Sequence, residues 1–382
     1  MNMKVRLGNY IQEYSVRNKA GEDIPVYSVT NTQGFCRDYF GKEVASKDKT
    51  TYKIVPRGCF AFNPSRINVG SVDWQRYEDR VIVSPLYNVF SVSPQLDQQY
   101  LYYFLKSDVA LQRIRSVATG SVRDNLKLSM LYEFPICLPD KEQQIEIVKR
   151  LDRIRHIIAL REQELQHLED LIKARFVELF GEPEYNTKSW PVYSLDKLCE
   201  VGSSKRIYQN EQSVTGVPFW RVSDLVSRME TGSADSGLYI PDEKFEELKQ
   251  AGLVPTAGDI LVTSRGTLGR CYIIKKEDRF YFQDGMISWL SHYTHGITPL
   301  YLQFLFSMPG FRKQIDNMQA GSTVAYLSIG MLKKLRVMVP SEEMQKAFAS
   351  FISQVDKSKF AVQKSLEETQ KLFDSLMQQY FG

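Results

Sequence analysis

The chain repeats itself once, and this internal repeat limits the possible folds more than any other feature. Residues 100–181 align without a gap on residues 301–382, at a shift of 201 positions. By direct count 15 of the 82 aligned pairs are identical, against about 6% expected from average composition. The chain is therefore a tandem duplication, and its two halves are expected to share one fold.

Each half begins with a mixed region of short apolar runs separated by turn residues. Val81–Pro85 and Gly258–Thr263 predict strands bounded by glycine or proline. Tyr100–Arg115 and Leu300–Ile315 carry aromatic and leucine residues at helical spacing, and they predict helices. Each half is thus expected to contain a mixed α+β domain of about 130 to 145 residues, here called a head.

Each half then ends in a long segment with a different pattern. Lys141–Phe180 contains neither proline nor glycine, and apolar residues recur in it every seven positions. Such heptads predict a long coiled-coil helix. The packing positions are Leu151, Ile158, Leu165, Ile172 and Leu179 in the first copy, and Ile352, Val355, Leu366 and Phe373 in the second. Arg161, Arg175, Lys359 and Thr369 interrupt the two stripes. The alternative is two amphipathic helices, each packed on its own head.

Connectivity predicts how the parts are arranged. A 40-residue helix is ~60 Å long, and the linker Gly181–Ser189 reaches at most ~31 Å. The second head is therefore expected near the far end of the first helix, and the second helix is expected to return antiparallel to it. The predicted fold class is α+β, with two mixed heads separated by an antiparallel coiled coil and related by a pseudo-two-fold axis. The predicted divisions are residues 1–133, 134–189, 190–334 and 335–382.

Composition excludes several classes of protein. Charged residues make up 25% of the chain and hydrophobic residues 43%, which is typical of globular proteins rather than disordered ones. No apolar run approaches the ~18 residues of a membrane span, and the first ten residues lack the apolar core of a signal peptide. The five cysteines are scattered and never form a C-x-x-C pair. The expected location is the cytoplasm, with reduced thiols.

The net charge of +4 is distributed unevenly along the chain. Residues 1–133 carry 18 basic and 13 acidic side chains, and residues 190–334 carry 16 and 15. Residues 134–189 carry 9 and 11, and residues 335–382 carry 6 and 6. The positive excess therefore lies in the heads, which favours nucleic acid at the heads and protein partners along the helices. An excess this small predicts weak DNA binding by the isolated chain.

No motif of an enzyme active site is present in the sequence. The chain lacks the Asp/Asn-Pro-Pro-Tyr/Phe tetrapeptide and the F-x-G-x-G loop of methyltransferases, and it lacks a G-x-x-x-x-G-K-[ST] phosphate loop. His292 and His295 have the spacing of metal ligands, but no cysteine or carboxylate cluster accompanies them, so two loop histidines are the default expectation. The chain is expected not to be an enzyme on its own and to bind no metal.

The heads instead carry polar loops that match between the two halves. Arginine can bond guanine and asparagine can bond adenine through two hydrogen bonds, whereas lysine and serine more often hold phosphates. The candidate DNA-binding residues are Asn63, Ser65, Arg66, Arg123 and Asn125 in the first head, and Lys205, Arg206, Thr263, Arg265 and Thr323 in the second. Arg66 with Gly70 resembles Arg265 with Gly269. One such loop alone is usually a solvated turn, so the matched occurrence carries the prediction.

Taken together, these features resemble the specificity (S) subunits of type I restriction–modification systems. The resemblance covers essentially the whole chain. It rests on the paired G-S-x-x-x-x-L…M-L segments that begin at 120 and 321, the aliphatic-Pro-x-x-E-x-Q entries at 138 and 339, the Phe-Gly endings, and the segment Gly258–Gly266. The first head departs from that last segment, since it has Gly58–Arg66 in its place.

The resemblance implies a division of labour within a larger complex. The heads are then target recognition domains that each read half of a split, non-palindromic site in double-stranded DNA. The coiled coil sets the gap and docks two modification (adenine methyltransferase) subunits. S-adenosylmethionine binds in those partners, and ATP and Mg²⁺ bind in a restriction/translocase subunit, so no cofactor is expected in this chain. No membrane partner is implied.

Three other interpretations remain open at the level of sequence. The chain could be a two-headed scaffold that binds proteins rather than DNA. It could be a nuclease or methyltransferase with a cryptic site in one head. It could also recognise DNA for a different complex, such as a fused nuclease-methylase. The sequence does not name the bases that are read, and it does not tell restriction from methylation alone.

Overall fold

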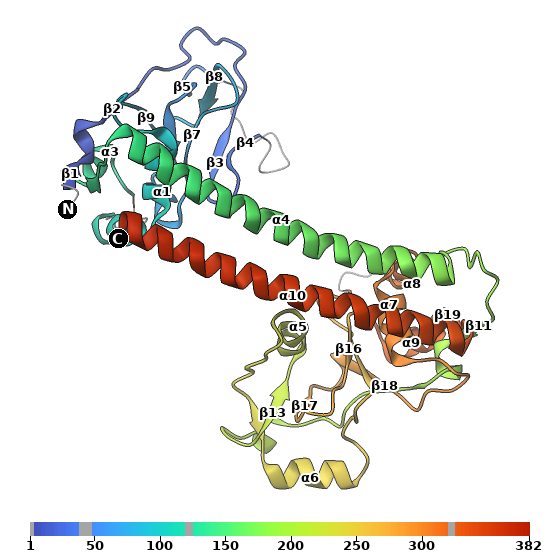
Figure 1. Ribbon diagram of the computed structural model, residues 1–382. Helices are drawn as coiled ribbons and strands as arrows, with labels where there is room; N and C mark the ends of the chain where they lie inside the picture. Colours follow the sequence, from blue (N-terminus) through green and yellow to red (C-terminus); the bar gives the residue numbers. More distant parts are fainter. Residues whose placement is uncertain (1–3, 38–47, 119–124, 320–324) are drawn as a thin grey trace. The chain divides into compact units, whose positions relative to one another are not determined.

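Two helices of 40 residues each dominate the secondary structure, α4 (Lys141–Phe180) and α10 (Glu342–Phe381). The computed structural model describes residues 4–37, 48–118, 125–319 and 325–382. The chain divides into unit 1, residues 1–163 with 362–382, and unit 2, residues 164–361. Each long helix is therefore shared: α4 begins in unit 1 and ends in unit 2, and α10 does the reverse (Figure 1).

Unit 1 contains the first head and ten described strands. Its helices are α1 (Gln98–Lys106), α2 (Asp108–Val117) and α3 (Leu128–Tyr132), besides its parts of α4 and α10. Its strands are β1 (Lys4–Arg6), β2 (Ile11–Glu13), β3 (Ser28–Thr30), β4 (Gly34–Cys36), β5 (Lys53–Pro56), β6 (Phe60–Phe62), β7 (Val72–Trp74), β8 (Arg80–Val83), β9 (Asn88–Val92) and β10 (Pro135–Cys137).

Unit 2 contains the second head and nine described strands. Its helices are α5 (Val222–Thr231), α6 (Asp242–Gln250), α7 (Pro299–Ser307), α8 (Pro309–Met318) and α9 (Ile329–Lys334). Its strands are β11 (Val192–Ser194), β12 (Glu200–Gly202), β13 (Val217–Trp220), β14 (Tyr239–Ile240), β15 (Ile260–Thr263), β16 (Cys271–Ile273), β17 (Tyr281–Phe282), β18 (Ile287–Ser291) and β19 (Arg336–Met338).

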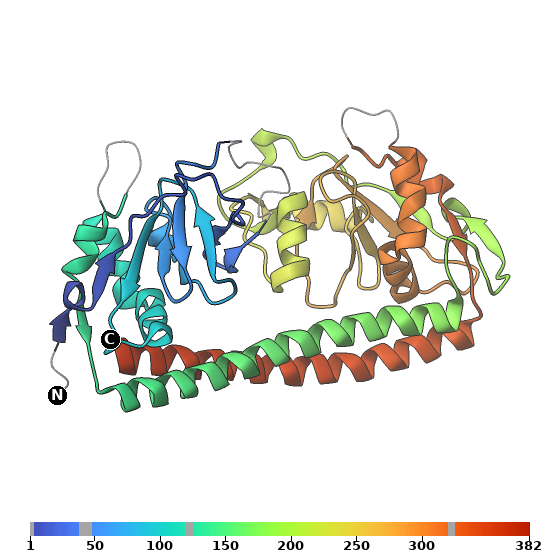
Figure 2. The same cartoon turned by 90° about the horizontal axis from the view of Figure 1, so that it is seen from above.

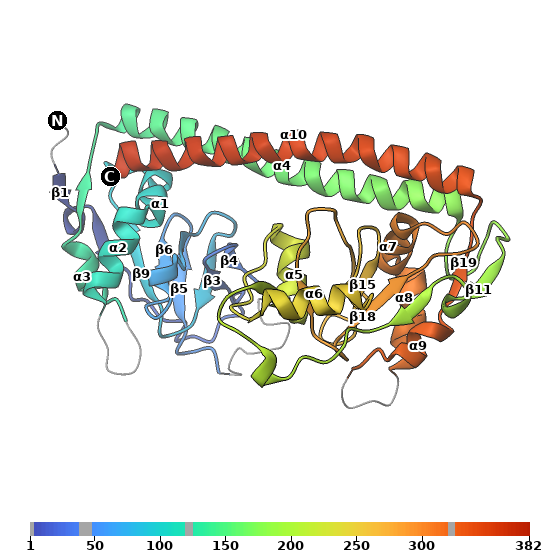
Figure 3. The same cartoon turned by 90° about the horizontal axis from the view of Figure 1, so that it is seen from below.

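A four-stranded antiparallel sheet recurs in both heads and confirms the duplication. The strand order is β2-β9-β6-β7 in unit 1 and β12-β18-β15-β16 in unit 2. Figure 3 labels the central strands of each sheet, β9 and β6 in the first and β18 and β15 in the second. The register also repeats, because Phe62 faces Asn88 in one sheet and Val262 faces Ser288 in the other. Short pairs β1-β10 and β11-β19 complete the shared framework. The strands predicted at 81–85 and 258–263 are confirmed as β8 and β15.

The heads differ in their additional strands. Unit 1 adds the two-stranded pairs β3-β4 and β5-β8, whereas unit 2 adds the three-stranded sheet β14-β13-β17. The pairing of β13 with β17 is parallel, and helices α5 and α6 accompany this sheet in the chain. Sequence similarity is weakest in these same parts of the two halves, so the shared framework carries different insertions in each head.

The predicted helices at 100–115 and 300–315 are each broken in the middle. Ser107 lies in extended conformation between α1 and α2, and its hydroxyl accepts a hydrogen bond from Ala110 N at 3.3 Å. Met308 takes the same place between α7 and α8, and Pro309 begins α8. An N-cap serine and an N1 proline are both signals of a helix start, and periodicity alone overlooked them.

The long helices run antiparallel, as predicted. In unit 1 the guanidinium of Arg150 lies 3.5 Å from the hydroxyl of Tyr380, so the start of α4 lies beside the end of α10 (Figure 2). In unit 2 Lys359 pairs with Glu169 at 3.3 Å, and Phe176 packs edge-on against Phe348 with 5.5 Å between ring centres. Partner numbers on α10 fall as those on α4 rise, which is the mark of an antiparallel pair.

The heptad residues lie on the packed faces of these helices. Leu151, Ile172 and Leu179 are buried on α4, and Ile158 and Leu165 are half-buried. On α10 Ile352 and Val355 are buried, and Leu366 and Phe373 are half-buried.

The polar interruptions of the stripe also have local partners. Arg175 pairs with Glu178 at 2.7 Å and lies over the ring of Phe351. Lys359 pairs with Glu169 across the helices, and Thr369 donates a hydrogen bond to Ser365 O at 2.7 Å. Arg161 is half-buried. Long polar side chains can cover apolar surface with their stems, so these positions interrupt the sequence pattern without breaking the helix pair.

A buried glutamine joins each long helix to its head in the same way. Gln144 Nε2 donates to Gln95 O at 3.0 Å and to Pro139 O at 2.9 Å, and its Oε1 accepts from Asp97 N at 2.7 Å. Gln345 makes the matching bonds to Gly296 O, Pro340 O and Thr298 N at 3.0, 2.9 and 2.9 Å. Asp97 and Thr298 are the N-caps of α1 and α7. Each glutamine therefore fixes a helix start in the head to the first turn of a long helix.

Replacing Gln345 by leucine is expected to lower the free energy of unfolding of unit 2 by about 3 kcal/mol. The change leaves two carbonyls and one N–H without their buried partner, at about 1 to 3 kcal/mol per unsatisfied group, partly offset by the apolar replacement. Urea denaturation of the full chain measures the loss. Gln354→Leu, on the exposed face of the same helix, is the control and should change stability by less than about 0.5 kcal/mol.

Candidate nucleic-acid interface

In the second head a tight loop between β15 and β16 presents Arg265. Thr263, at the end of β15, is completely buried. Its hydroxyl donates to Thr267 O and accepts from Arg270 N at 3.0 Å. Thr263 therefore closes the loop from inside, whereas Arg265 at the loop's tip is exposed. Of these two predicted residues only Arg265 is exposed to solvent.

A second segment holds Arg265 from the side. The guanidinium lies over the ring of Tyr326, 5.3 Å from its centre. Tyr326 is itself fixed to Gln319, which accepts from Tyr326 N at 2.8 Å and donates to Tyr326 O at 3.1 Å. The ring attracts the cation through its face without accepting a conventional hydrogen bond, so the N–H groups of the guanidinium can still donate to a ligand. Arg265 is thus oriented without an acidic partner in contact among the described residues.

The predicted basic segment Lys205-Arg206 lies at the same end of the sheet. Ser203 donates to Ile287 O at 3.0 Å, at the start of β18. Ser264 N, in the Arg265 loop, donates to Met286 O at 2.9 Å, one residue earlier. Both segments are therefore fixed to the same end of β18. The structure brings Lys205, Arg206 and Arg265 to one side of the second head.

Lys205 and Arg206 differ in their surroundings. Lys205 N donates to the hydroxyl of Tyr281 at 2.8 Å, and burial raises the pKa of that hydroxyl to about 12. The side chains of both Lys205 and Arg206 are exposed. Arg206 pairs with Asp284 at 3.0 Å, a partner 78 residues away. DNA binding by Arg206 would compete with this ion pair, so Lys205 and Arg265 are the stronger candidates.

In the first head the matching loop gathers Asn63, Ser65 and Asn125. Asn63 Oδ1 accepts from Ser65 N at 3.1 Å, and the Ser65 hydroxyl donates to Asn125 Oδ1 at 2.6 Å. Asn63 and Ser65 are half-buried, whereas Arg66 and Asn125 are exposed. Three predicted residues that are up to 62 positions apart thus lie together, with Arg66 beside them. Arg123 of the first head and Thr323 of the second lie outside the described residues.

The loops of the two heads are anchored alike but differ in length. Leu126 N donates to Pro64 O at 3.1 Å, and Leu327 N donates to Ser264 O at 3.0 Å. The bond from Asn63 N to Ser71 O corresponds to the bond from Thr263 N to Arg270 O, so the first loop is one residue longer. When the two loops are aligned at their first residues, Asn63 and Thr263, Ser65 is the counterpart of Arg265. When they are aligned at Gly70 and Gly269 instead, Arg66 is the counterpart of Arg265. The two arginines therefore match in sequence but stand at different places in their loops.

Two further residues of the first head, Tyr87 and Lys53, adjoin this site although the sequence did not single them out. The hydroxyl of Tyr87 is hydrogen bonded to Asn63, and burial raises its pKa above the ordinary value. Lys53 Nζ donates to Tyr87 O at 2.7 Å; burial lowers the pKa of its ammonium, and the negative charge of Glu13 opposes this shift in part. Lys53 lies on β5 and Arg17 forms a bridge with it. The long-range pairing of β5 with β8 places Lys53, and no local motif in the sequence predicts it.

The two histidines with metal-like spacing have separate surroundings. His292 Nδ1 lies 3.2 Å from a carboxylate oxygen of Glu200. The ring of His295 instead packs on Tyr193, with ring centres 4.8 Å apart. Across residues 4–37, 48–118, 125–319 and 325–382 no group of three or more His, Cys, Asp or Glu side chains is placed to hold a metal ion. Within the same residues no helix is both long and apolar enough to cross a membrane.

Comparison with known proteins gives the family. A family model described as the type I restriction modification DNA specificity domain matches residues 5–170 and, a second time, residues 187–370. The chain belongs to this family. The two matches follow the internal repeat, and together they account for most of the chain. The resemblance inferred from the paired segments at 120 and 321 is thus confirmed, as is the tandem repeat of one domain.

Individual members of the family share modest sequence identity with the chain. A type I restriction enzyme specificity subunit of Haemophilus influenzae is 24% identical over 299 residues, which cover 75% of this chain and 72% of the relative. The MjaVIII specificity subunit of Methanocaldococcus jannaschii is 22% identical over 298 residues, or 74% of this chain and 69% of the relative. Both matches extend over more than two thirds of each protein.

Solved structures share the fold. A chain from a study of complex assembly and conformational transition in a type I R-M system aligns with a TM-score of 0.61 at 16% identity, covering 99% of this chain and 97% of its own length. The type I restriction-modification S subunit of M. genitalium aligns with a TM-score of 0.54 at 16% identity, covering 100% and 96%. At this level of identity the likeness concerns the fold alone.

Proposed function

We propose that the chain is the DNA-recognition subunit of a type I restriction–modification complex. Each head reads one half of a bipartite, asymmetric site, and the paired helices set the gap between the halves and dock two modification subunits. The observation that carries this proposal is the specificity domain found twice in one chain, each copy with an exposed arginine loop at the end of its four-stranded sheet. Two related readers on one chain suit a site of two halves.

The difference between the heads supports an asymmetric site. The first head offers Asn63, Ser65, Arg66 and Asn125, whereas the second offers Lys205, Arg265 and a loop one residue shorter. Asparagine suits adenine and arginine suits guanine in the major groove. Heads with such different side chains are expected to read different half-sites. The middle base pairs then make no contact with either head.

The division of labour in the complex follows from what this chain offers. The heads provide orientation and base contacts, whereas the methyl transfer with S-adenosylmethionine belongs to the modification subunits. The ATP-driven and Mg²⁺-dependent steps belong to a restriction/translocase subunit. Because the first head carries a charge of +5 and the second only +1, much of the phosphate contact has to come from the partners. The isolated chain is accordingly expected to bind DNA weakly.

The experiment that tests this function maps methylation across a genome with and without the chain, in the presence of its modification subunits. The expected result is methylation at one bipartite site that disappears when the chain is removed. Methylation or cleavage by the purified chain alone would instead show an enzyme. A complete lack of DNA binding, with and without the modification subunits, would support a protein scaffold.

Arg265→Ala is expected to weaken binding of the assembled complex to its own site about tenfold to a hundredfold. This is the range of a side chain that bonds a base through two hydrogen bonds, about 1 to 3 kcal/mol. Selectivity should relax at one position of one half-site, and the other half-site should be read as before. Arg279→Ala is the matched control, since Arg279 also lies over a ring, that of Phe245, and pairs with Asp242 on the same head.

Binding to random duplexes and to site variants separates two roles for Arg265. A loss of equal size on every sequence, with a smaller salt dependence, would place the guanidinium on a phosphate rather than on a base. No loss at all would remove the β15–β16 loop from the interface.

A further inference from the structure

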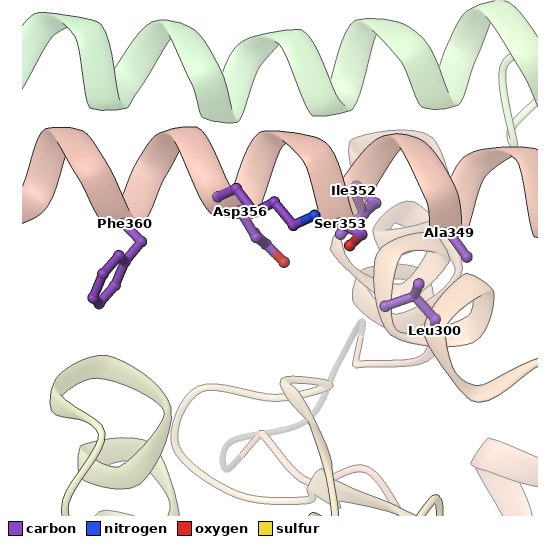
Figure 4. Close-up of a pocket in the computed structure, with 7 residues that line it drawn as sticks. Leu300, Ala349, Ile352, Ser353, Asp356 and Phe360 are labelled. Carbon is purple, nitrogen blue, oxygen red and sulfur yellow. The ribbon is translucent and has the colours of Figure 1, made fainter.

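The surface beside each long helix is hollowed at the same place in the two units. In unit 2 a hollow of about 570 Å³ lies between Leu300 of α7 and the face of α10 that ends at Phe360 (Figure 4). In unit 1 a hollow of about 340 Å³ lies between Trp74, the start of α1 and the first turns of α4. These are called hollow 2 and hollow 1 below.

The internal repeat makes the two hollows equivalent. At the shift of 201 residues, three lining positions coincide: Gln99 with Leu300, Val148 with Ala349, and Asp152 with Ser353. The glutamines that join head and helix, Gln144 and Gln345, lie in the first turns of the same helices and make matching bonds. A surface that occurs twice at equivalent positions suits one kind of partner in two copies.

The two hollows differ in chemistry. Phe360 is 74% exposed on a helix whose neighbouring side chains are charged, and in Figure 4 it points away from α4. Leu300 and Ile352 extend this apolar surface into hollow 2. A large exposed aromatic ring beside an apolar hollow is typical of a binding anchor rather than of a solvated helix face.

Hollow 1 has no aromatic ring as exposed as Phe360, since its most exposed large apolar side chain is Ile145, at 39%. The position equivalent to Phe360 is Ala159, and Asp356 is replaced by Arg155. The polar side chains of hollow 1 already bond one another: Trp74 Nε1 donates to Gln99 Oε1 at 3.1 Å, and Gln99 Nε2 donates to Asp152 Oδ1 at 3.4 Å. A partner that covers hollow 1 therefore gains less from burying apolar surface than one that covers hollow 2.

We propose that each hollow takes the same surface of a modification subunit, one copy per unit, and that hollow 2 binds its copy more tightly because Phe360 anchors it. This inference rests on the proposed function and adds an order to the assembly. The first modification subunit to bind occupies hollow 2 on unit 2, and the second one occupies hollow 1 on unit 1. The partner surface is apolar at its centre, to match Phe360, and polar at its rim, to match Asp356 and Lys357 in hollow 2 and Lys149 and Asp152 in hollow 1.

The test titrates the full chain with the modification subunit of the same system and measures stoichiometry by native mass spectrometry and sedimentation. The wild-type chain should bind two copies with stepwise dissociation constants at least tenfold apart. Phe360→Ala should weaken the tighter step tenfold or more and leave the weaker step unchanged. Ala159→Phe should strengthen the weaker step. Leu372→Ala, which removes a 52% exposed leucine from α10 in unit 1 outside both hollows, should change neither step.

Each contrary outcome identifies what failed. Two equal constants, or constants that Phe360→Ala leaves unchanged while two copies still bind, would overturn this inference and leave the proposed function standing. A wild-type chain that binds no modification subunit would overturn the proposed function and this inference with it. If the wild-type chain self-associates and the Phe360→Ala chain does not, hollow 2 binds a second copy of this chain. That result would also overturn the inference that hollow 2 binds a modification subunit. Because Phe360 is exposed, the thermal melting curve of the Phe360→Ala chain should match that of the wild type. A matching curve rules out misfolding as the cause of weaker binding.

Discussion

A chain with seven residues added to each long helix is expected to recognise the same two half-sites with a gap about three base pairs longer. The insertions belong between residues 163 and 164 of α4 and between 361 and 362 of α10, where the chain passes from one unit to the other. Seven residues lengthen a helix by ~10 Å, and a base pair occupies ~3.4 Å of DNA. A whole heptad keeps the apolar stripe in phase. Both helices have to grow, since lengthening one alone would shift the antiparallel pairing.

Methylation mapping of the assembled complex measures this change directly. The half-sites should keep their letters, because neither head is touched. A matched control carries seven residues replaced rather than inserted at the same places, and its gap should stay unchanged. Altered half-site letters with an unaltered gap would contradict the assignment of the gap to the helices. An inactive complex that still forms with two modification subunits would show that the spacing of the heads tolerates no change.

Phe176→Ala is expected to cost unit 2 about 3 to 5 kcal/mol of stability, the range of a fully buried phenylalanine. Phe176 is 0% exposed and lies at the centre of an aromatic cluster. Its ring stacks on Tyr301 at 5.6 Å and meets Phe180 and Phe348 at 4.8 and 5.5 Å between centres. The cluster joins α4, α7 and α10, so the cavity would open where head and helices meet.

Tryptophan fluorescence in urea can measure this loss in unit 2 alone. Trp190, Trp220 and Trp289 lie in unit 2, whereas Trp74 is the remaining tryptophan and lies in unit 1. In a Trp74→Phe background all of the signal therefore reports unit 2. The repeat supplies the control, because Met377 in unit 1 is the counterpart of Phe176 and is half-buried. Met377→Ala should shift the unit 2 transition by less than about 0.5 kcal/mol. An equal shift would mean that the two units unfold as one.

Patterns that are local and periodic in the sequence predicted their structure well. Lys141–Phe180 has no proline or glycine and keeps its heptads, and α4 spans those same residues. The breaks at Ser107 and Met308 were missed because helical periodicity continues across them. The decisive signals there are a serine hydroxyl that accepts a backbone N–H and a proline at the first helical position. Periodicity reports which face is buried, whereas capping reports where a helix begins.

The candidate site was predictable only in part. Exposed Arg265 and the group Asn63, Ser65 and Asn125 follow from matched loops in a repeat. The ring of Tyr326 and the carboxylate of Asp284 decide how the basic groups are presented, yet both lie more than 60 residues from their partners. Such contacts are made by the sheet and leave no local trace. Thr263 shows the converse, because a hydroxyl in a polar loop looks available in the sequence and lies inside the fold.

The division of α10 between the units has a consequence for how the chain folds as it is made. Unit 2 is one continuous stretch, residues 164–361, whereas unit 1 combines residues 1–163 with 362–382. The core of unit 1 includes Phe381, which lies against Tyr100 and Phe104 at 5.1 and 6.3 Å between ring centres. Because chains emerge from the ribosome N-terminus first, the head that is made first is completed last. Until the end of α10 has been made, the apolar surface of the first head that Phe381 covers stays exposed. A chaperone that shields nascent chains should therefore act mainly on the first head.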